Sequence, residues 1–493
     1  MAPSAIDDAD TDAAIPSTRR SPMTTIEQPV THPDVDVASR QYRTTNPATG
    51  EVLREFPRAT DEEAEAMLTR ADAAYRSWRA TPVAERVMLF KALADLIDAN
   101  ADELARLTTT EMGKPLAQSR GEVTMASGMF RYYAEYGEEL LADEEVSVPG
   151  FSRAITRREP VGVVLGIEPW NGPMYQAMRA TAPNLMLGNT VLLKPSEISA
   201  GSTLFFDSLF TDAGFPEGVY QTALVSTDQV STYIADPRIR AVTLTGSDRA
   251  GSAVGEQAGR HIKPVVLELG GSDAFVVLDS ADVAKAAGVA SACRLAIGGQ
   301  VCISPKRMIV VDSVADEFIA AFTEVFGNQV VGDPFDPATT VGPLSSATAA
   351  DHLQAQYQDA LDKGATVLVP GGRVDGPGAF FTPAAITDIT PQMRVYTEEA
   401  FGPLAMIYRV PDADAAVELA NGSVYGLGGT VYGDPDEARA VAERLDTGGV
   451  GINRYLGAPL EIPFGGTKRS GVGRELGRSG MDQFANIKTY GIA

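Results

Sequence analysis

The stretch Val161-Gly162-Val163-Val164-Leu165-Gly166-Ile167 is a short apolar run rich in β-branched residues. A run of this length that ends at turn residues predicts a buried strand. Similar runs follow at residues 190–193, 241–245, 265–267 and 274–278, and several are separated by segments long enough for a helix. Strands that alternate with helices predict parallel sheets built from βαβ units, so we expect an α/β fold.

Two helices are predicted ahead of these strands. Thr60 is a suitable N-cap with Glu63 in the capping-box position, and apolar residues recur at helical spacing as far as Trp78. A second helix is predicted to begin at Thr81-Pro82. Residues 1–39 are rich in Ala, Asp, Pro, Ser and Thr without periodicity and predict a disordered tail.

Composition excludes several classes of function. A chain of 493 residues is too long for one hydrophobic core, so two or more domains are expected. Its 41 basic and 65 acidic residues give 41 − 65 = −24, which disfavours nucleic acid and membrane surfaces as partners. No run of eighteen apolar residues and no secretory signal occurs, so we expect a cytoplasmic protein. Two cysteines and three histidines without ligand spacing predict neither a disulfide framework nor a metal site.

Cys302 is the candidate nucleophile. It lies in Gly298-Gly299-Gln300-Val301-Cys302-Ile303-Ser304-Pro305, where the two glycines permit a tight turn that aims backbone amides at a reacting group. A nucleophilic cysteine needs a lowered pKa or a favourable dipole. The alternative is a buried, inert thiol, which is what we expect of Cys293 in its alanine-rich helical stretch.

Three further motifs follow predicted strands. Glu268 ends the run 265–267, and burial there would make it a general base, the alternative being a salt-bridged glutamate. Asn171, in Pro169-Trp170-Asn171-Gly172-Pro173, has an amide that could donate to an oxyanion, the alternative being a plain turn. Gly246-Ser247 opens a predicted helix and is a candidate phosphate cradle, although it is not the usual dinucleotide fingerprint.

Taken in order, these segments resemble the aldehyde dehydrogenase superfamily over about residues 44–490, and within it the succinate-semialdehyde dehydrogenases. Further matching stretches are Lys194-Pro195-Ser196-Glu197, Glu398-Glu399-Ala400-Phe401-Gly402-Pro403, Pro463-Phe464-Gly465-Gly466-Thr467-Lys468 and Ser470-Gly471-Val472-Gly473-Arg474-Glu475-Leu476-Gly477. The semialdehyde enzymes are matched by Tyr133-Ala134-Glu135, Leu267-Glu268-Leu269-Gly270-Gly271-Ser272-Asp273 and Gln176-Ala177-Met178-Arg179.

The resemblance implies a Rossmann-like cofactor domain, an α/β catalytic domain and a small β arm for oligomerisation. The expected boundaries are residues 40–142 and 161–268 for the NAD-binding domain, 269–466 for the catalytic domain, 143–160 with 484–493 for the arm, and 467–483 for a return segment to the cofactor domain. An arm of this kind leaves a strand edge to be covered, so a homodimer or homotetramer is expected.

The resemblance also implies a reaction. Cys302 would attack the aldehyde carbon, while the Asn171 amide and the Cys302 backbone N–H hold the oxyanion. Hydride transfer to nicotinamide would leave a thioester, and Glu268 would activate water to hydrolyse it. Glu475 matches a position that supports the base in some relatives, with a structural role as the alternative.

For the cofactor, the resemblance places Trp170, Gly246 and Ser247 at the pyrophosphate, Lys194 with Glu197 at the adenine ribose, and Glu399 with Phe401 at the nicotinamide ribose. A carboxylate at Glu197 accepts from ribose hydroxyls and repels a 2′-phosphate. NAD is therefore expected, with NADP as the alternative because Lys194 offsets some of that repulsion.

Arg179 is the predicted anchor for a substrate carboxylate. General aldehyde dehydrogenases often carry tryptophan here and semialdehyde enzymes carry arginine. On a chain of net charge −24, a carboxylate substrate needs a local fork donor, which arginine supplies. The alternative is a salt bridge to a neighbouring acid, and Arg454 is a candidate second anchor.

Several positions depart from the family pattern. Ile297 and Gly298 stand where an asparagine and a variable residue are common, and Ala296 where some semialdehyde enzymes have a second arginine. Ala180 replaces a common lysine, and Glu168 and Gly172 beside the Trp-Asn pair are unusual. These departures leave Cys302 in place and bear on the substrate.

The sequence leaves three alternatives to the hydrolytic oxidation of a semialdehyde. Acyl transfer to CoA is disfavoured, because that branch of the family typically lacks a glutamate at the position of Glu268. An inactive, structural family member is disfavoured by the presence of Cys302, Glu268 and Asn171 together. The third alternative is an uncharged aldehyde substrate with Arg179 merely structural.

Overall fold

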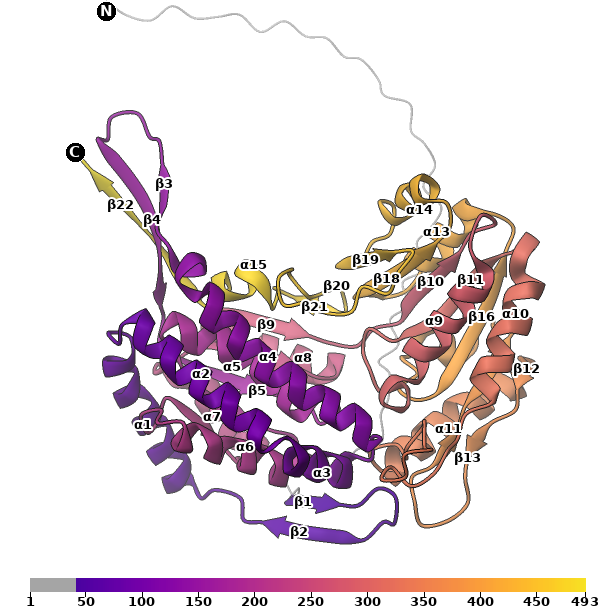
Figure 1. The fold of residues 1–493 in the computed structure, drawn as a ribbon, viewed down its shortest axis with the longest axis horizontal. Coiled ribbons are helices and arrows are strands. Elements are labelled where there is room, and N and C mark those ends of the chain that lie inside the picture. The colour runs from indigo at the N-terminus through magenta and orange to yellow at the C-terminus, as the bar shows by residue number, and fades with distance from the viewer. Residues whose placement is uncertain (1–40) are drawn as a thin grey trace, which may run out of the picture. The chain divides into compact units, whose positions relative to one another are not determined.

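The computed structural model describes residues 41–493, so the predicted tail of residues 1–39 lies outside the described residues. Two mainly parallel sheets and one smaller antiparallel sheet, with helices packed against them, make up the described part (Figure 1). This architecture confirms the predicted α/β class. Among residues 41–493, no helix combines the length and apolar character that crossing a membrane requires.

The first sheet has six strands in the order β21-β9-β8-β5-β6-β7. All neighbours run parallel except β21 and β9. The strands are β5 (Val163–Ile167), β6 (Thr190–Lys194), β7 (Tyr220–Thr222), β8 (Ile239–Thr245), β9 (Val265–Glu268) and β21 (Gly471–Val472). Four of them lie where the apolar runs predicted strands, and their carboxyl ends meet at one edge, where ligands bind in sheets of this kind.

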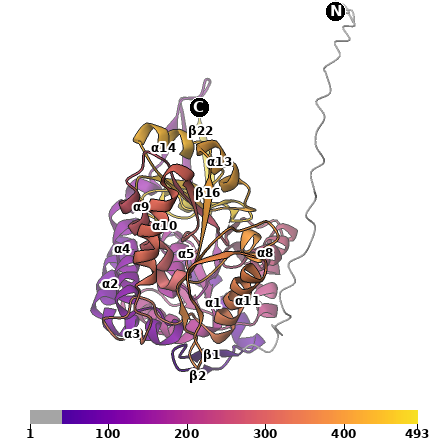
Figure 2. The same cartoon turned by 90° about the vertical axis from the view of Figure 1, so that its right-hand side faces the viewer.

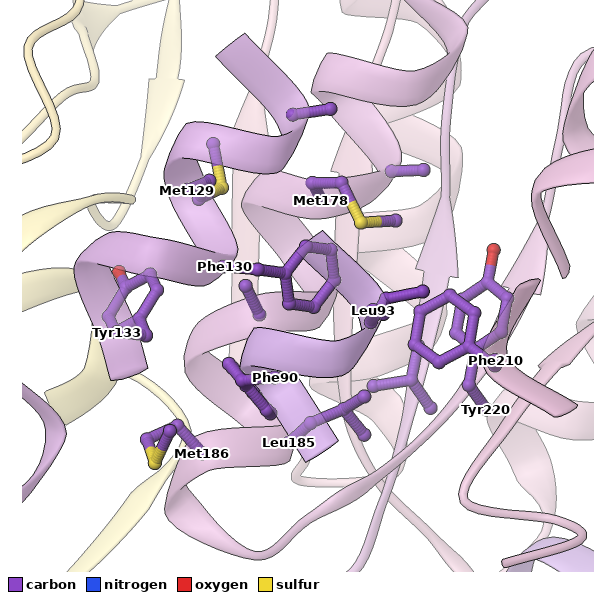
Figure 3. Packing of buried hydrophobic residues seen from close by; sticks show 14 of the residues in the cluster. Phe90, Leu93, Met129, Phe130, Tyr133, Met178, Leu185, Met186, Phe210 and Tyr220 are labelled. Atoms are coloured by element: carbon purple, nitrogen blue, oxygen red, sulfur yellow. The ribbon is translucent and has the colours of Figure 1, made fainter. Parts of the chain in front are cut away.

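Successive side chains of these strands point to opposite faces of the sheet and belong to two hydrophobic clusters. Both faces are therefore apolar, and helices cover both. Helices α2, α4, α5 and α6 cover one face, and α1, α7 and α8 the other. On the first face Phe90 and Phe130 meet edge to face at 5.1 Å, and Phe210 stacks on Tyr220 at 4.1 Å (Figure 3). The helices are α1 (Asp61–Trp78), α2 (Val83–Ala99), α3 (Ala101–Met112), α4 (Leu116–Leu141), α5 (Pro173–Leu187), η2 (Glu197–Ser199), α6 (Ala200–Asp212), α7 (Thr227–Ala235) and α8 (Asp248–Arg260).

The start of α1 confirms the capping box predicted at Thr60. The Thr60 hydroxyl accepts from the Glu63 backbone N–H at 3.2 Å, and the Glu63 carboxylate accepts from the Thr60 N–H at 2.8 Å. Two of the otherwise unpaired N–H groups at the helix end are thereby satisfied, which stabilises the helix by about 1 kcal/mol. The second predicted helix, α2, begins directly after Pro82.

The second sheet has seven strands in the order β12-β15-β16-β11-β10-β18-β19, and only β12 and β15 are antiparallel. The strands are β10 (Asp273–Val277), β11 (Pro305–Val311), β12 (Thr366–Val369), β15 (Ala384–Thr387), β16 (Leu404–Val410), β18 (Gly428–Tyr432) and β19 (Gly449–Ile452). Helices α9 and α10 cover one face, and α11, α13 and α14 the other. Figure 2 shows α10 and α11 on opposite sides of β16. The helices are α9 (Val283–Leu295), η3 (Ala296–Gly299), α10 (Asp312–Gly327), α11 (Ala347–Asp362), α12 (Arg394–Thr397), α13 (Ala413–Asn421) and α14 (Pro435–Ala442).

A three-stranded antiparallel sheet unites two distant segments of the chain in the order β22-β4-β3. Its strands are β3 (Glu144–Val146), β4 (Arg153–Pro160) and β22 (Ala485–Ile492), and Figure 1 shows them extending away from the six-stranded sheet. The remaining elements are the pairs β1 (Tyr42–Thr45) with β2 (Val52–Phe56), β13 (Gly372–Arg373) with β14 (Phe381–Thr382), and β17 (Tyr425–Gly426) with β20 (Thr467–Lys468), and the helix α15 (Gly477–Asp482). The segments expected to form the arm therefore pair with each other.

Candidate active site

Cys302 lies in the loop between η3 and β11, and glycine conformations shape its approach. Gly298 and Gly299 have φ of +61° and +77°, in the left-handed region that glycine favours. A Cβ on Gly299 would also collide with the Gly402 backbone. The predicted tight turn is therefore present, and it brings the cysteine loop against the loop that follows α12.

Arg294 ties these two loops together, and sequence reasoning did not single it out. Its guanidinium is fully buried and donates to the carbonyl oxygens of Gly299 at 3.2 Å, Ala400 at 2.7 Å and Leu404 at 2.9 Å. It also donates to the Ser304 hydroxyl at 2.7 Å. A helical arginine in an apolar stretch gave no sequence signal for this role, because its partners are backbone oxygens.

The Cys302 side chain is half-buried and lies among opposing charges. Burial raises its pKa to about 12, while the nearby cations of Lys306 and Arg179 lower it and the carboxylates of Glu399 and Asp273 raise it. Cys293, within α9, has its pKa raised to about 11 by burial alone. Of the two thiols, Cys302 is therefore the one whose pKa is also set by neighbouring charged groups.

Asn171 follows β5 and is held against the cysteine loop. Its side-chain amide donates to the Gln300 carbonyl oxygen at 3.0 Å, two residues before Cys302. The backbone carbonyl oxygen of Asn171 accepts from the Lys114 ammonium at 3.1 Å. An amide has two protons, so one remains to donate to a substrate oxygen near Cys302.

A buried ion pair supports this turn from α4. Lys114 pairs with Glu122, and the other Glu122 oxygen accepts from the backbone N–H groups of Met174 at 2.8 Å and Tyr175 at 3.0 Å. The carboxylate therefore caps the first turn of α5, where the helix dipole favours negative charge. Neither residue was predicted, because the two lie about fifty residues before the turn that they hold.

Glu268 ends β9 with its side chain 2% exposed. Burial raises its pKa well above the usual value, Glu475 raises it further, and Arg179 and Arg474 lower it. Neither of its carboxylate oxygens has a hydrogen-bond partner among the described residues. A Cβ on Gly465 would come within 2.6 Å of one of them, so glycine leaves the room that this carboxylate occupies.

A second unpartnered carboxyl, Glu168, lies in the same row of the sheet. The register places Ile167 of β5 beside Leu244 of β8, and Thr245 beside Glu268, so Glu168, Thr245 and Glu268 follow one another across three strand ends. Burial and Glu475 raise the pKa of Glu168 well above the usual value. This departure from the family pattern therefore puts a second carboxyl with a raised pKa two strands away from the candidate base.

Arg179, predicted to bind a substrate carboxylate, forms the salt bridge that the sequence left open. Its Nε donates to Glu475 at 2.5 Å, and the two side chains are 2% and 3% exposed. Its guanidinium also lies 4.5 Å from the centre of the Phe464 ring. Because its charge acts on both Glu268 and Cys302, Arg179 lies at the centre of the candidate site.

A small cavity of about 30 Å³ opens at the residue that follows the candidate nucleophile. Its lining includes Ile303, the neighbour of Cys302, together with Tyr455, Phe464 and Gly465. Most of its lining is apolar, the one carboxyl is that of Asp273, and no lysine or arginine of residues 41–493 lines it. Arg454, the second predicted anchor, is exposed at the end of β19 and is not part of this lining.

The predicted cofactor residues gather at the carboxyl edge of the six-stranded sheet. The Lys194 ammonium at the end of β6 lies 2.8 Å from the Glu197 carboxylate. Gly246 donates its N–H to the Glu268 carbonyl at 2.9 Å, and Ser247 is the exposed N-cap of α8. An exposed helix N-terminus at this edge is suited to a pyrophosphate.

The remaining cofactor candidates are Trp170, which follows β5, and Glu399 and Phe401, which follow α12. The rings of Trp170 and Phe401 contact edge to face at 5.8 Å. Glu399 accepts from the Gly271 N–H at 3.1 Å and lies 3.0 Å from the Lys306 ammonium. Within residues 41–493, no three His, Cys, Asp or Glu side chains are arranged to hold a metal.

Comparison with known proteins gives the family. The model of the aldehyde dehydrogenase family matches residues 35–490. The chain is 50% identical over 450 residues to a succinate-semialdehyde dehydrogenase [NADP(+)] of Deinococcus radiodurans, covering 91% of this chain and 94% of the relative. It is 46% identical over 453 residues to a protein of the same name from Mycobacterium ulcerans, covering 91% and 99%.

A solved structure agrees with this. The succinic semialdehyde dehydrogenase of Streptococcus pyogenes, in complex with NADP+, superposes with a TM-score of 0.89 at 40% identity, covering 92% of this chain and 99% of that one. Sequence and fold thus agree, and the chain belongs to the aldehyde dehydrogenase family.

Proposed function

We propose that this protein oxidises succinate semialdehyde to succinate with NADP+ as the electron acceptor. The observation that carries the proposal is the 50% identity, over nearly all of both chains, to the succinate-semialdehyde dehydrogenase [NADP(+)] of Deinococcus radiodurans. The aldehyde and water are converted to the acid, and two electrons leave as hydride. Each chemical step has a candidate residue in the site.

Cys302 is the proposed nucleophile. As the thiolate, its sulfur adds to the aldehyde carbon, and the resulting oxyanion accepts hydrogen bonds from the free proton of the Asn171 amide and from the Cys302 backbone N–H. A nicotinamide cofactor held at the carboxyl edge of the six-stranded sheet would supply the hydride acceptor, and the acyl group would then remain on Cys302 as a thioester. The hydrogen bond from Asn171 to Gln300 holds the amide against the loop that carries Cys302.

Glu268 is the proposed general base for hydrolysis. Burial and the charge of Glu475 raise its pKa, so the carboxylate accepts a proton from water more readily than an exposed glutamate does. The hydroxide so formed attacks the thioester carbonyl and the Cys302 thiolate leaves. Its unpartnered oxygens are free to contact that water.

The residues at the carboxyl edge of the six-stranded sheet fit a dinucleotide. The exposed N-terminus of α8 at Gly246 and Ser247 suits the pyrophosphate, and Trp170 with Phe401 and Glu399 suits the nicotinamide half. For the adenosine half we favour NADP+ over the NAD that Glu197 alone predicted. The Lys194 ammonium at 2.8 Å offsets the charge that would repel a 2′-phosphate, and the relatives are named for NADP(+).

The substrate carboxylate has two candidate partners. Arg179 lies behind Phe464, which lines the cavity, but its charge is shared with Glu475. Arg454 is exposed next to Tyr455, which also lines the cavity. We propose that both cations contribute to binding the carboxylate, with Arg179 acting at longer range than a direct salt bridge.

An uncharged aldehyde is the second candidate substrate. The observation in its favour is the mainly apolar cavity beside Ile303, together with the pairing of Arg179 to Glu475. On that account Arg179 is structural and the catalytic residues are unchanged.

The test is the rate of NADPH formation by purified protein with succinate semialdehyde and with butanal, each also measured with NAD+. A kcat/KM that favours the semialdehyde and NADP+ supports the proposal. Equal rates or a preference for butanal would favour the uncharged substrate. No turnover of either would contradict both proposals and favour an inactive family member.

We also propose that the protein is a homodimer or homotetramer joined through its three-stranded sheet. Apolar side chains on or beside this sheet are unusually exposed: Val146, Val148, Phe151, Ile487 and Ile492 are 38–50% exposed. A second copy would cover the sheet's free strand edge and these side chains.

A further inference from the structure

Lys306 is a buried cation that sequence reasoning did not single out. It is the second residue of β11, and its side chain is 0% exposed. Its ammonium donates to the carbonyl oxygens of Val301 at 2.8 Å and Cys302 at 2.5 Å, and lies 3.0 Å from the Glu399 carboxylate. These three partners match the three protons of an ammonium, as a buried charge requires.

The contacts of Lys306 join three segments at one point. The Cys302 carbonyl oxygen, which accepts from the ammonium, also lies close to Gly271, since a Cβ on Gly271 would come within 2.5 Å of it. The Glu399 oxygen that faces Lys306 also accepts from the Gly271 N–H at 3.1 Å. The ammonium therefore contacts the nucleophile loop and the Glu399 loop directly, and the stretch that follows Glu268 joins them through Gly271.

The charge of Lys306 acts on the thiol as well as on the backbone. Among the charged groups around Cys302, Lys306 is the one that most lowers its pKa, ahead of Arg179, while Glu399 and Asp273 raise it. In the low-dielectric interior, an opposite charge at this range favours the thiolate. Two of the charged groups that act on the Cys302 sulfur, Lys306 and Glu399, thus also contact each other.

We propose that Lys306 is a positioning residue that holds the nucleophile loop against Glu399 and keeps a positive charge beside the Cys302 thiolate. This inference rests on the proposed role of Cys302 as the nucleophile. The inference goes beyond that role because it assigns the stabilisation of the thiolate to Lys306, which contacts the backbone of the loop. The negative charge of Glu399 opposes this stabilisation.

The test is the rate at which iodoacetamide alkylates Cys302 between pH 7 and 10, in the absence of aldehyde and cofactor. Peptide mapping separates Cys302 from Cys293. The Lys306→Met variant is expected to alkylate about tenfold more slowly at pH 8, because removal of an opposite charge at this range raises the thiol pKa by one unit or more. Lys285→Met, an exposed lysine in α9, is the matched control and should leave the rate unchanged.

If Lys306 had only a structural role, its removal would change the alkylation rate in the opposite direction. If Lys306 only held the loop, its removal would loosen the loop, expose the buried thiol and speed up alkylation. Burial raises the pKa of Tyr175 and Tyr455, so both stay neutral over most of the range from pH 7 to 10. Their titration therefore does not contribute to the change in the alkylation rate.

The Glu399→Gln variant keeps the proposal testable if Lys306→Met does not fold. Loss of the opposing negative charge should speed alkylation several-fold, since Lys306 then acts on the thiolate without compensation. Alkylation of Lys306→Met at or above the wild-type rate, or no gain in Glu399→Gln, would overturn the proposal. Neither measurement needs turnover, so each outcome is independent of whether the protein oxidises succinate semialdehyde.

Discussion

The Nε of Arg179 donates to a carboxylate oxygen of Glu475 at 2.5 Å, and both side chains are at most 3% exposed. The pair connects α5 to the loop before α15 and sets the charge felt by both Glu268 and Cys302. Arg179, which the sequence suggests for substrate recognition, therefore also changes the pKa values of Glu268 and Cys302.

Arg179→Gln should destabilise the protein by about 3–5 kcal/mol, because it leaves the Glu475 carboxylate buried without its partner. The free energy of unfolding in urea measures this loss. The double variant Arg179→Gln with Glu475→Gln should recover most of it, since a pair of neutral amides leaves no buried charge. Wild-type stability in the single variant would show that the ion pair is not formed in solution.

Glu168→Gln should alter how stability depends on pH. Burial raises the pKa of Glu168 in the folded state, so the folded protein binds more protons than the unfolded chain between the unfolded and folded pKa values. Stability contributed by this group is therefore lost as pH rises through that window. Urea unfolding at pH 5.5 and 8.5 should show a smaller loss of stability in Glu168→Gln than in wild type.

The exposed Glu62→Gln in α1 is the control for this measurement and should retain the wild-type pH dependence. An identical pH dependence in Glu168→Gln and wild type would contradict the expectation.

Lys194→Met should reduce kcat/KM for NADP+ about tenfold or more and change that for NAD+ much less. A charge-assisted contact to a phosphate contributes about 1.5–3 kcal/mol, and loss of Lys194 leaves the charge of Glu197 uncompensated. Initial rates with each cofactor give the ratio. Equal losses for the two cofactors would place Lys194 away from the 2′-phosphate.

Ile487→Asp should dissociate the proposed oligomer, because it puts a charge on the exposed apolar side of β22, where Ile487 is 47% exposed. Light scattering coupled to size-exclusion chromatography gives the mass of each species. Val52→Asp, at a 53% exposed valine in β2, is the matched control. A wild-type protein that is already monomeric would refute the proposed assembly.

Much of the fold was predictable because it depends on local patterns. The apolar runs locate β5, β6, β8, β9 and β10, and the capping box at Thr60 locates the start of α1. The candidate residues Cys302, Asn171 and Glu268 follow strands or glycine turns, so motif and position together identify them. Their roles stay predictions until a reaction is measured.

The supporting contacts were not predictable, for a physical reason. Lys306, Arg294 and Lys114 bind backbone oxygens or distant carboxylates, and a backbone acceptor leaves no mark on the sequence. The pairing of Arg179 was open for the same reason, since Glu475 lies 296 residues away. The sequence analysis allowed for an offset of the Glu197 charge by Lys194, but the distance of 2.8 Å between the two charged groups is given only by the fold.

The most direct test of the account is to trap the acyl-enzyme. Glu268→Gln protein is incubated with succinate semialdehyde and NADP+, and its intact mass and peptide map are measured. The account predicts one succinyl group on Cys302, one equivalent of NADPH formed in a burst, and no adduct in Glu268→Gln with Cys302→Ala. Release of succinate at the wild-type rate, or an adduct on any residue other than Cys302, would contradict it.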